Sequence, residues 1–204
     1  MKSRGLFVVF EGIDGCGKST QARRVARARD ALLVFEPGGT PVGADLRRWI
    51  LDVATPMAPS TVALMLLADR SHHVRTVIEP ALDAGRAVVC DRYYASTLAY
   101  QGYGGGVDLA QLRAATDLAI GECRPDLTVL IDLDPVTANG RREPDRRDRF
   151  ESLHPQFHDR VRQGYLELAA QDPAAWYVVD GTPDEATVAA VIDERLAALA
   201  WASD

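Results

Sequence analysis

Five short apolar runs alternate with longer amphipathic stretches along the chain. In each run nearly every position is apolar, and the runs fall at residues 6–10, 32–35, 87–90, 127–133 and 176–179. Apolar positions recur with helical spacing at residues 18–29, 43–51, 61–83, 109–121, 155–170 and 185–200. Strands that are apolar on both faces and separated by helices predict an α/β fold, in which helices cover both sides of a parallel sheet. The chain has no repeat and no break in composition, so we expect a single domain over residues 1–204.

Residues 141–149, with the sequence RREPDRRDR, do not follow this pattern. The segment holds five arginines, three acidic residues and a proline, and it has no apolar residue. It lacks the side chains that a core requires, and we therefore expect an exposed loop.

The first predicted strand leads directly into a match to the phosphate-binding loop. The pattern G-x-x-x-x-G-K-[ST] is complete, and an amphipathic helix follows it at once, as the motif requires. Backbone N–H groups and the positive end of the helix would face the phosphates, Lys18 would reach the β- and γ-phosphates, and Ser19 would bind Mg²⁺. The residues expected to bind ATP are Gly12, Ile13, Asp14, Gly15, Cys16, Gly17, Lys18, Ser19 and Thr20. A glycine-rich turn without a ligand is the alternative, which this context disfavours.

Asp91 and Arg92 follow the third predicted strand. The carboxyl ends of parallel strands meet at one edge of the sheet, so we expect this pair beside the phosphate loop, with Asp91 toward the metal ion and Arg92 toward a second, anionic substrate. An ion pair at the strand end is the alternative. The sequence has no Asn-Lys-x-Asp for reading guanine, and no apolar strand ends in Asp-Glu as in motor ATPases. A small kinase fits these features better than either class.

Composition narrows the possible partners. Hydrophobic residues make up 47% of the chain and charged residues 25%, which is typical of a globular protein. No apolar run approaches the roughly 18 residues of a membrane span, so we expect no membrane partner. The net charge of −6 argues against a broad nucleic-acid-binding surface. Lys18 is one of only two lysines among 23 cationic residues, which indicates a site that requires a compact ammonium group.

The three cysteines are Cys16, Cys90 and Cys123. They are too few and too irregularly spaced for a disulfide framework or a zinc site, and they fit free thiols in a reducing cytosol. We therefore expect a cytoplasmic protein. Cys16 lies close to the start of a predicted helix, which would lower the pKa of its thiol.

Further motifs resemble bacterial thymidylate kinases (dTMP kinases). They are EPGGT at residues 36–40, DRY at 91–93, STLAYQG at 96–102, PDLT at 125–128 and DRFE at 148–151. They occur in the family's order and span most of the chain. The resemblance implies a P-loop nucleoside monophosphate kinase fold with five parallel strands. It also implies transfer of the γ-phosphoryl group of MgATP to dTMP, giving dTDP and ADP, by a homodimer.

The resemblance assigns roles in the acceptor site. Arg47 and Arg92 would hold the phosphate of dTMP, because a fixed phosphate needs charge-assisted donors. Asp14 would accept a hydrogen bond from the 3′-hydroxyl, and Tyr100 would crowd the 2′ position. The residues that would read the thymine ring are Arg70, Ser96, Thr97 and Gln101. The whole set implied for dTMP is Asp14, Glu36, Pro37, Arg47, Leu66, Arg70, Arg92, Ser96, Thr97, Tyr100 and Gln101.

Members of this family carry their catalytic arginine either in the phosphate loop or in a lid. Gly15 occupies the loop position here, whereas residues 141–149 are rich in arginine, so the chain resembles the lid-arginine type, with a mobile lid at about 141–151. A lid arginine over the γ-phosphate would neutralise charge and exclude water. The candidate catalytic residues are Lys18, Asp91, Arg92, Arg141, Arg142, Arg146, Arg147 and Arg149. The alternative, which composition alone would favour, is that residues 141–149 form a solvated surface loop.

Position 66 departs from the family. Its members usually have phenylalanine four residues before the arginine that is Arg70 here, to stack on thymine, and this chain has Leu66. Leu66 is either a core residue or a thinner wall of the base pocket.

Two rival functions stay open. One is a kinase of the same fold acting on a deoxynucleoside or on another monophosphate. The other is a regulatory protein that has lost catalysis, which the presence of Lys18, Asp91 and Arg92 disfavours.

Overall fold

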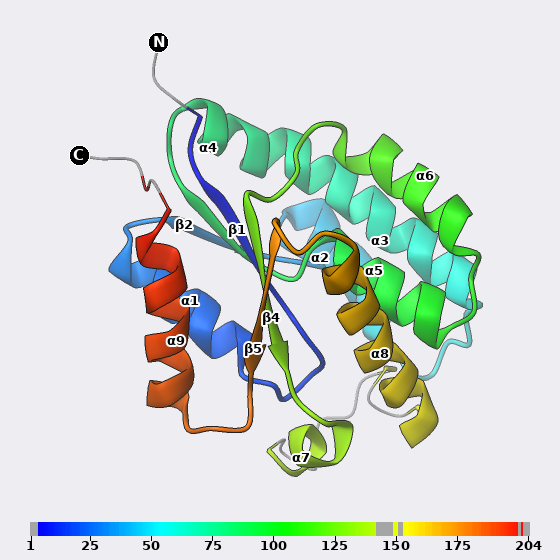
Figure 1. The fold of residues 1–204 in the computed structure, drawn as a ribbon. Helices are drawn as coiled ribbons and strands as arrows, with labels where there is room; N and C mark the ends of the chain where they lie inside the picture. Colours follow the sequence, from blue (N-terminus) through cyan, green and yellow to red (C-terminus); the bar gives the residue numbers. More distant parts are fainter. Residues whose placement is uncertain (1–3, 142–148, 151–152, 200, 202–204) are drawn as a thin grey trace.

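Five parallel strands form one sheet in the order β2-β3-β1-β4-β5 (Figure 1). The computed structural model describes residues 4–141, 149–150, 153–199 and 201. The strands are β1 (Phe7–Glu11), β2 (Leu32–Phe35), β3 (Val88–Asp91), β4 (Leu127–Asp132) and β5 (Trp176–Asp180). The predicted five-stranded parallel sheet is confirmed, and the ends of each strand lie within a residue or so of the expected positions.

Helices connect the strands. They are α1 (Lys18–Ala28), α2 (Pro41–Leu51), α3 (Pro59–His73), α4 (Glu79–Asp83), α5 (Tyr94–Thr97), α6 (Leu109–Ile120), α7 (Pro135–Gly140), α8 (Pro155–Gln171) and α9 (Glu185–Ala197). Two π-helical segments, η1 (Val74–Ile78) and η2 (Leu98–Gly104), continue α3 and α5. The stretch predicted as one helix over 61–83 is therefore α3, η1 and α4 in succession.

Two helical regions were not predicted from the sequence pattern. Residues 94–104 are almost entirely buried and carry no amphipathic pattern, so periodicity could not reveal α5 and η2. The short α7 begins with Pro135, and the Asp134 side chain accepts a hydrogen bond from the Thr137 N–H at 2.9 Å. An N-cap aspartate followed by proline is a pattern that predicts the start of a helix.

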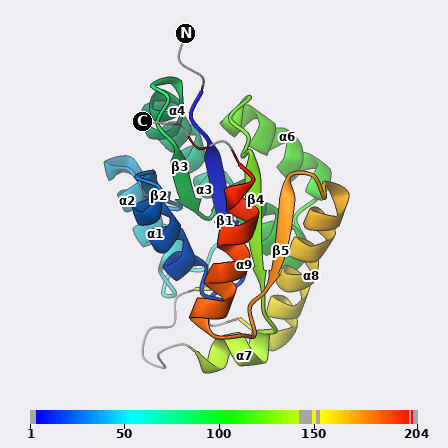
Figure 2. The ribbon, with the colours of Figure 1, turned by 60° about the vertical axis from the view of Figure 1, so that its left-hand side comes forward.

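The two faces of the sheet are covered by different helices. Alternate residues of a strand point to opposite faces, so Val8 and Phe10 pack with α1 and α9, whereas Phe7 and Val9 pack with α3, η1, α4 and α6. Figures 1 and 2 both place α1 and α9 together on one side of the sheet and α3 and α6 on the other. Within the described part of the chain, no helix is long and apolar enough to cross a membrane.

The strand order creates a crevice at the carboxyl edge of the sheet. β1 and β3 are neighbours, but the connection after β1 leads to β2 on one side of this pair and the connection after β3 leads to β4 on the other side. Such a divergence is where open parallel sheets bind ligands. The glycine-rich loop after β1 and the Asp91-Arg92 pair after β3 both lie at this edge.

Candidate active site

The loop between β1 and α1 has the backbone shape that its glycines allow. Gly12 has a φ of +139°, and a Cβ atom there would lie 2.6 Å from the Ile131 carbonyl oxygen, so only glycine fits. Gly17 caps α1 with a φ of +96°, and Lys18 is the first residue of the helix. The loop therefore places the start of α1 at the carboxyl edge of the sheet.

Lys18 and Asp14 form an ion pair within this loop. The Lys18 ammonium lies 3.2 Å from Asp14 Oδ1 and 3.3 Å from the Ile13 carbonyl oxygen. The Asp14 carboxylate also accepts hydrogen bonds from Arg92 and, at 2.9 Å, from the Tyr100 hydroxyl. Burial disfavours the charge on Asp14, but Arg92 and Lys18 outweigh it and hold the pKa of this carboxyl far below its ordinary value. Asp14 is therefore an ionised acceptor.

The expectation of a lowered pKa for the Cys16 thiol is wrong. Cys16 is only 3% exposed and packs in the core cluster under the loop. Burial raises the pKa of its thiol, and this effect exceeds the opposing influence of Lys18. The three cysteines are all free, as expected, and the structure shows that all of them are buried.

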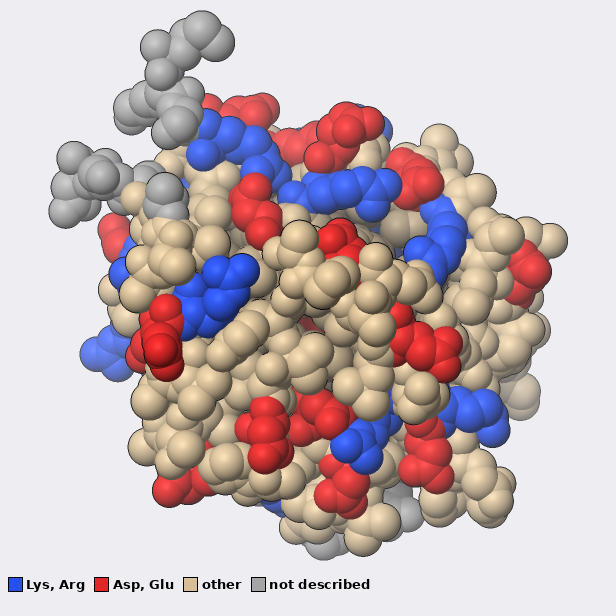
Figure 3. Space-filling view, in the orientation of Figure 1, with Lys and Arg blue, Asp and Glu red and all other residues tan. Residues whose placement is uncertain are grey.

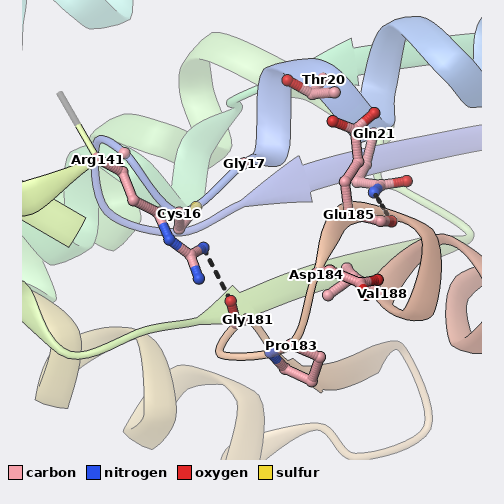
Figure 4. A pocket seen from close by; sticks show the side chains of 11 residues that line it. Cys16, Gly17, Thr20, Gln21, Arg141, Gly181, Pro183, Asp184, Glu185 and Val188 are labelled. Atoms are coloured by element: carbon pink, nitrogen blue, oxygen red, sulfur yellow. Dashed lines mark hydrogen bonds between the residues drawn. The ribbon is translucent and has the colours of Figure 1, made fainter. Parts of the chain in front are cut away.

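A cavity of about 350 Å³ opens on one side of the phosphate loop (Figure 4). Its walls are the loop, the first turns of α1 and the connection from β5 to α9. Its lining residues are Gly15, Cys16, Gly17, Thr20, Gln21, Arg141, Gly181, Pro183, Asp184, Glu185 and Val188. The Gln21 amide donates to the Glu185 carbonyl at 3.1 Å and ties the two walls together. The wall at residues 181–188 was not predicted from the sequence, although the carboxyl end of the last parallel strand lies at the same edge of the sheet.

A second cavity, of about 100 Å³, lies on the other side of the loop. It brings together all eleven residues predicted for the acceptor and adds Leu51 and Phe150. Leu66 lines this cavity and also packs with Ile50 and Val62, so both interpretations of Leu66 describe part of its position. Phe150 stands edge-on to Tyr100, with ring centroids 5.5 Å apart, and so brings an aromatic ring to the cavity, where position 66 has none.

A buried ion pair forms the floor of this second cavity. The Arg70 guanidinium donates from Nε to Glu36 Oε2 at 2.7 Å and from its terminal nitrogens to Thr97 Oγ1 and the Tyr93 carbonyl, each at 3.0 Å. The other Glu36 oxygen lies 2.9 Å from His73 Nδ1. His73 was not singled out by the sequence. Because a buried charge needs several partners, this arrangement fixes Arg70 against the helix of Thr97.

The Arg92 side chain donates several hydrogen bonds at the carboxyl edge of the sheet. One terminal nitrogen, NH1, donates to Gly12 O and Ser96 Oγ at 3.0 Å and to the Tyr165 hydroxyl at 3.1 Å. The other, NH2, donates to Asp14 and, at 3.3 Å, to the Tyr100 hydroxyl. Burial opposes the charge of Arg92, yet Asp14 raises its pKa well above the ordinary value. Its backbone φ of +70° is rare for a residue with a side chain.

Glu11 and Tyr165, which lie beside Arg92, were not predicted from the sequence as site residues. Glu11 ends β1 and is fully buried, and Tyr165 reaches it from α8. Burial raises the pKa of Glu11, although Arg92 and hydrogen bonds from Ser96, Tyr93 and Tyr165 oppose the shift. A glutamate directly before the phosphate loop was the available signal.

The oxygens of Asp91 and Ser19 are the candidates for a metal ion. Asp91 ends β3, and its Oδ1 is buried with no hydrogen-bond partner among the described residues. Ser19 is the second residue of α1. The described part of the chain has no group of three or more His, Cys, Asp or Glu side chains that could hold a metal by themselves. Mg²⁺ needs few protein ligands when phosphates and waters complete its shell, so this donor set fits it.

The predicted lid arginines have different positions. Arg141 donates to the carbonyls of Gly181 and Thr182 at 2.9 and 3.1 Å, across the larger cavity (Figure 4). Arg149 donates to the carbonyls of Ile50, Asp52 and Thr55 around the end of α2 and is half-buried, so the expectation of a wholly exposed segment is wrong there. Arg142, Arg146 and Arg147 lie outside the described residues.

The fold and the two cavities on either side of a phosphate loop define a P-loop nucleotide kinase. A family model described as thymidylate kinase matches residues 10–192. The thymidylate kinase of Desulforudis audaxviator is 45% identical over 202 residues, covering 96% of this chain and 91% of the relative. That of Geobacter sulfurreducens is 42% identical over 206 residues, covering 94% and 97%. The crystal structure of thymidylate kinase from Ehrlichia chaffeensis superposes with a TM-score of 0.79 at 30% identity, covering 95% and 99%. This chain therefore belongs to the thymidylate kinase family, whose reaction is the phosphorylation of dTMP to dTDP.

Proposed function

We propose that the chain transfers the γ-phosphoryl group of MgATP to dTMP by direct in-line displacement. The observation that carries this proposal is the place of the phosphate loop between the two cavities. Gly15 lines the larger cavity, and its neighbour Asp14 lines the smaller one. A donor in the first and an acceptor in the second would therefore bring their phosphates together over Lys18, the cation of this loop.

The larger cavity suits the nucleoside of ATP. It adjoins the amide groups of the phosphate loop. Arg141 lies across it, and its guanidinium donates hydrogen bonds to the carbonyls of Gly181 and Thr182. Mg²⁺ would be held by Asp91 and Ser19, and when bound it supplies positive charge to the donor phosphates. Lys18 adds a second positive charge, and no covalent enzyme intermediate is required.

The smaller cavity suits dTMP. We propose that Arg92 and Arg47 take its phosphate, that Arg70 and Gln101 read the base, and that Tyr100 limits the space at the 2′ position. The Arg47 side chain donates to the Pro37 carbonyl at 2.7 Å, which keeps it along the same wall of the cavity. The ion pair of Arg70 with Glu36 supports a base-reading role, because it fixes the guanidinium before any ligand binds.

We propose that the catalytic arginine lies in the lid segment, among the arginines of residues 141–149. Gly15 offers no charge in the loop, and Arg149 already donates to three backbone carbonyls near α2. Arg141 is beside the donor cavity. Arginine-to-alanine variants at each of the five lid positions, compared by kcat, would identify the residue, and Arg149→Ala should lower stability more than kcat. Five equal, small effects on kcat would contradict a lid arginine.

A homodimer is proposed from two exposed apolar side chains on neighbouring helices. Leu64 on α3 is 66% exposed and Leu118 on α6 is 82% exposed, and these helices pack side by side (Figure 1). Leu118→Glu should shift the sedimentation coefficient to that of a monomer, whereas Val191→Glu on α9 should not.

On the face drawn in Figure 3, acidic and basic side chains alternate, without a broad basic area. The absence of nucleic-acid partners and the cytoplasmic location stay predictions.

A substrate panel tests the proposed function. Purified protein with MgATP should phosphorylate dTMP far faster than dUMP, dCMP, UMP or thymidine, as measured by coupled ADP release. A preference for thymidine or another monophosphate would favour a rival kinase of the same fold. No turnover with any of them would favour a regulatory protein.

A further inference from the structure

Glu11 is a buried carboxylate that receives hydrogen bonds on both oxygens. Oε1 accepts from the backbone N–H groups of Tyr93 at 2.8 Å and Ser96 at 3.1 Å. Oε2 accepts from the hydroxyls of Ser96 at 2.7 Å and Tyr165 at 2.9 Å. Four donors satisfy a carboxylate without any proton of its own.

The two hydroxyls also contact each other, at 2.8 Å between Ser96 Oγ and the Tyr165 oxygen. Together with Glu11 Oε2 they form a triangle of oxygen atoms that shares two protons. Each hydroxyl has a single proton, so when both protons are donated to Oε2 the contact between the two hydroxyls holds no proton. The remaining lone pairs of both hydroxyls are free to face Arg92.

Arg92 meets this triangle with one terminal nitrogen. NH1 donates to Ser96 Oγ at 3.0 Å and to the Tyr165 hydroxyl at 3.1 Å. The other terminal nitrogen lies against Asp14 and Tyr100, both of which line the smaller cavity. The triangle thus holds one terminal nitrogen of Arg92, NH1, while the other terminal nitrogen, NH2, contacts Asp14 and Tyr100.

We propose that Glu11 and Tyr165 are positioning residues, which hold Arg92 ready for the acceptor phosphate by directing two hydroxyl protons away from its guanidinium. This inference rests on the proposed role of Arg92. It also gives α8 a function in the acceptor site, because Tyr165 is the only member of the triangle that this helix contributes.

The substitution Glu11→Gln tests the direction of the protons with almost no change in shape. The two backbone N–H groups cannot reverse, so the amide oxygen must take the place of Oε1. The amide nitrogen then takes the place of Oε2 and donates into the triangle, so at least one hydroxyl proton loses its acceptor there and can point toward Arg92. Tyr165→Phe instead removes one acceptor of Arg92, and Tyr177→Phe on β5 serves as the matched control.

Each of the two variants should raise KM for dTMP roughly tenfold and should leave KM for ATP within about twofold. Tyr177→Phe should change neither KM. In an Arg92→Ala background, Glu11→Gln and Tyr165→Phe should raise KM for dTMP no further. Melting temperatures of all variants identify any that fail to fold, and Tyr165→Phe keeps the test decisive if Glu11→Gln is unstable.

Three outcomes would overturn the inference. They are an unchanged KM for dTMP in Tyr165→Phe, an equal rise of KM for ATP, and effects that persist without Arg92. If Arg92→Ala itself leaves KM for dTMP unchanged, the proposed role of Arg92 fails first. If Arg92→Ala raises it and the two new variants do not, the proposed function stands and only the positioning role is lost.

Discussion

Arg92 combines a left-handed backbone with five side-chain hydrogen bonds, and the two can be separated by mutation. Its φ of +70° is unfavourable for any residue with a Cβ atom, by about 1–2 kcal/mol. The side-chain contacts and the backbone hydrogen bond from Arg92 N–H to Phe10 O at 2.9 Å hold the residue in this conformation. Strain of this kind persists where surrounding contacts impose it, which is common at functional sites.

We expect Arg92→Gly to be more stable than Arg92→Ala, although glycine usually destabilises. Both variants lose the guanidinium, but only alanine keeps the Cβ atom that makes this φ unfavourable. Glycine costs about 0.5–1 kcal/mol more conformational entropy on folding, which leaves a net difference of about 1 kcal/mol in the free energy of unfolding. For a chain of this length that corresponds to about 2–4 °C in melting temperature.

Thermal and urea denaturation of the two variants, followed by circular dichroism, measure this difference. Both should show the same large rise in KM for dTMP, because the loss of the guanidinium is common to them. If alanine proves as stable as glycine or more so, the backbone at position 92 is not strained in solution, and the side-chain contacts do not hold it against an opposing cost.

Four further predictions concern the same site. Lys18→Ala should lower kcat by orders of magnitude while circular dichroism stays unchanged, because it removes the cation of the phosphate loop, and near-normal turnover would refute that role. Tyr100→Ala should relax the preference for the deoxyribose form of the acceptor and Tyr100→Phe should keep it, as measured by kcat/KM for dTMP and its ribose counterpart; equal rejection by both variants would rule out a steric role. Leu66→Phe should tighten dTMP by up to roughly tenfold through added aromatic contact, whereas unchanged affinity with a lowered melting temperature would assign Leu66 to the core. Cys16 should react with iodoacetamide at neutral pH far more slowly in the folded protein than in urea, since burial raises the pKa of its thiol, and equal rates would contradict that burial.

Short-range patterns in the sequence determined the helices, the strands and the glycine-rich loop that follows β1. Strands such as β1 and β4 are apolar at nearly every position because both of their faces are covered, and the glycines at positions 12 and 17 are needed for local backbone shape. These patterns depend on interactions between residues that are close in the sequence, so they can be recognised before the fold is known. The residues predicted for the acceptor came from the family resemblance, and all of them line one cavity in the structure.

The tertiary structure alone decided which partners these side chains meet. Tyr165 and Glu11 are 154 residues apart, and Arg149 and Ile50 are 99 apart, so no local pattern connects them. The same holds for the wall of the larger cavity at residues 181–188, which reaches the phosphate loop only because all five strands end at one edge. Cys16 lies beside a helix N-terminus in the sequence, but core packing sets its pKa through burial. Hydrogen bonding and desolvation depend on distance in space, and the order of the strands in the sheet sets those distances.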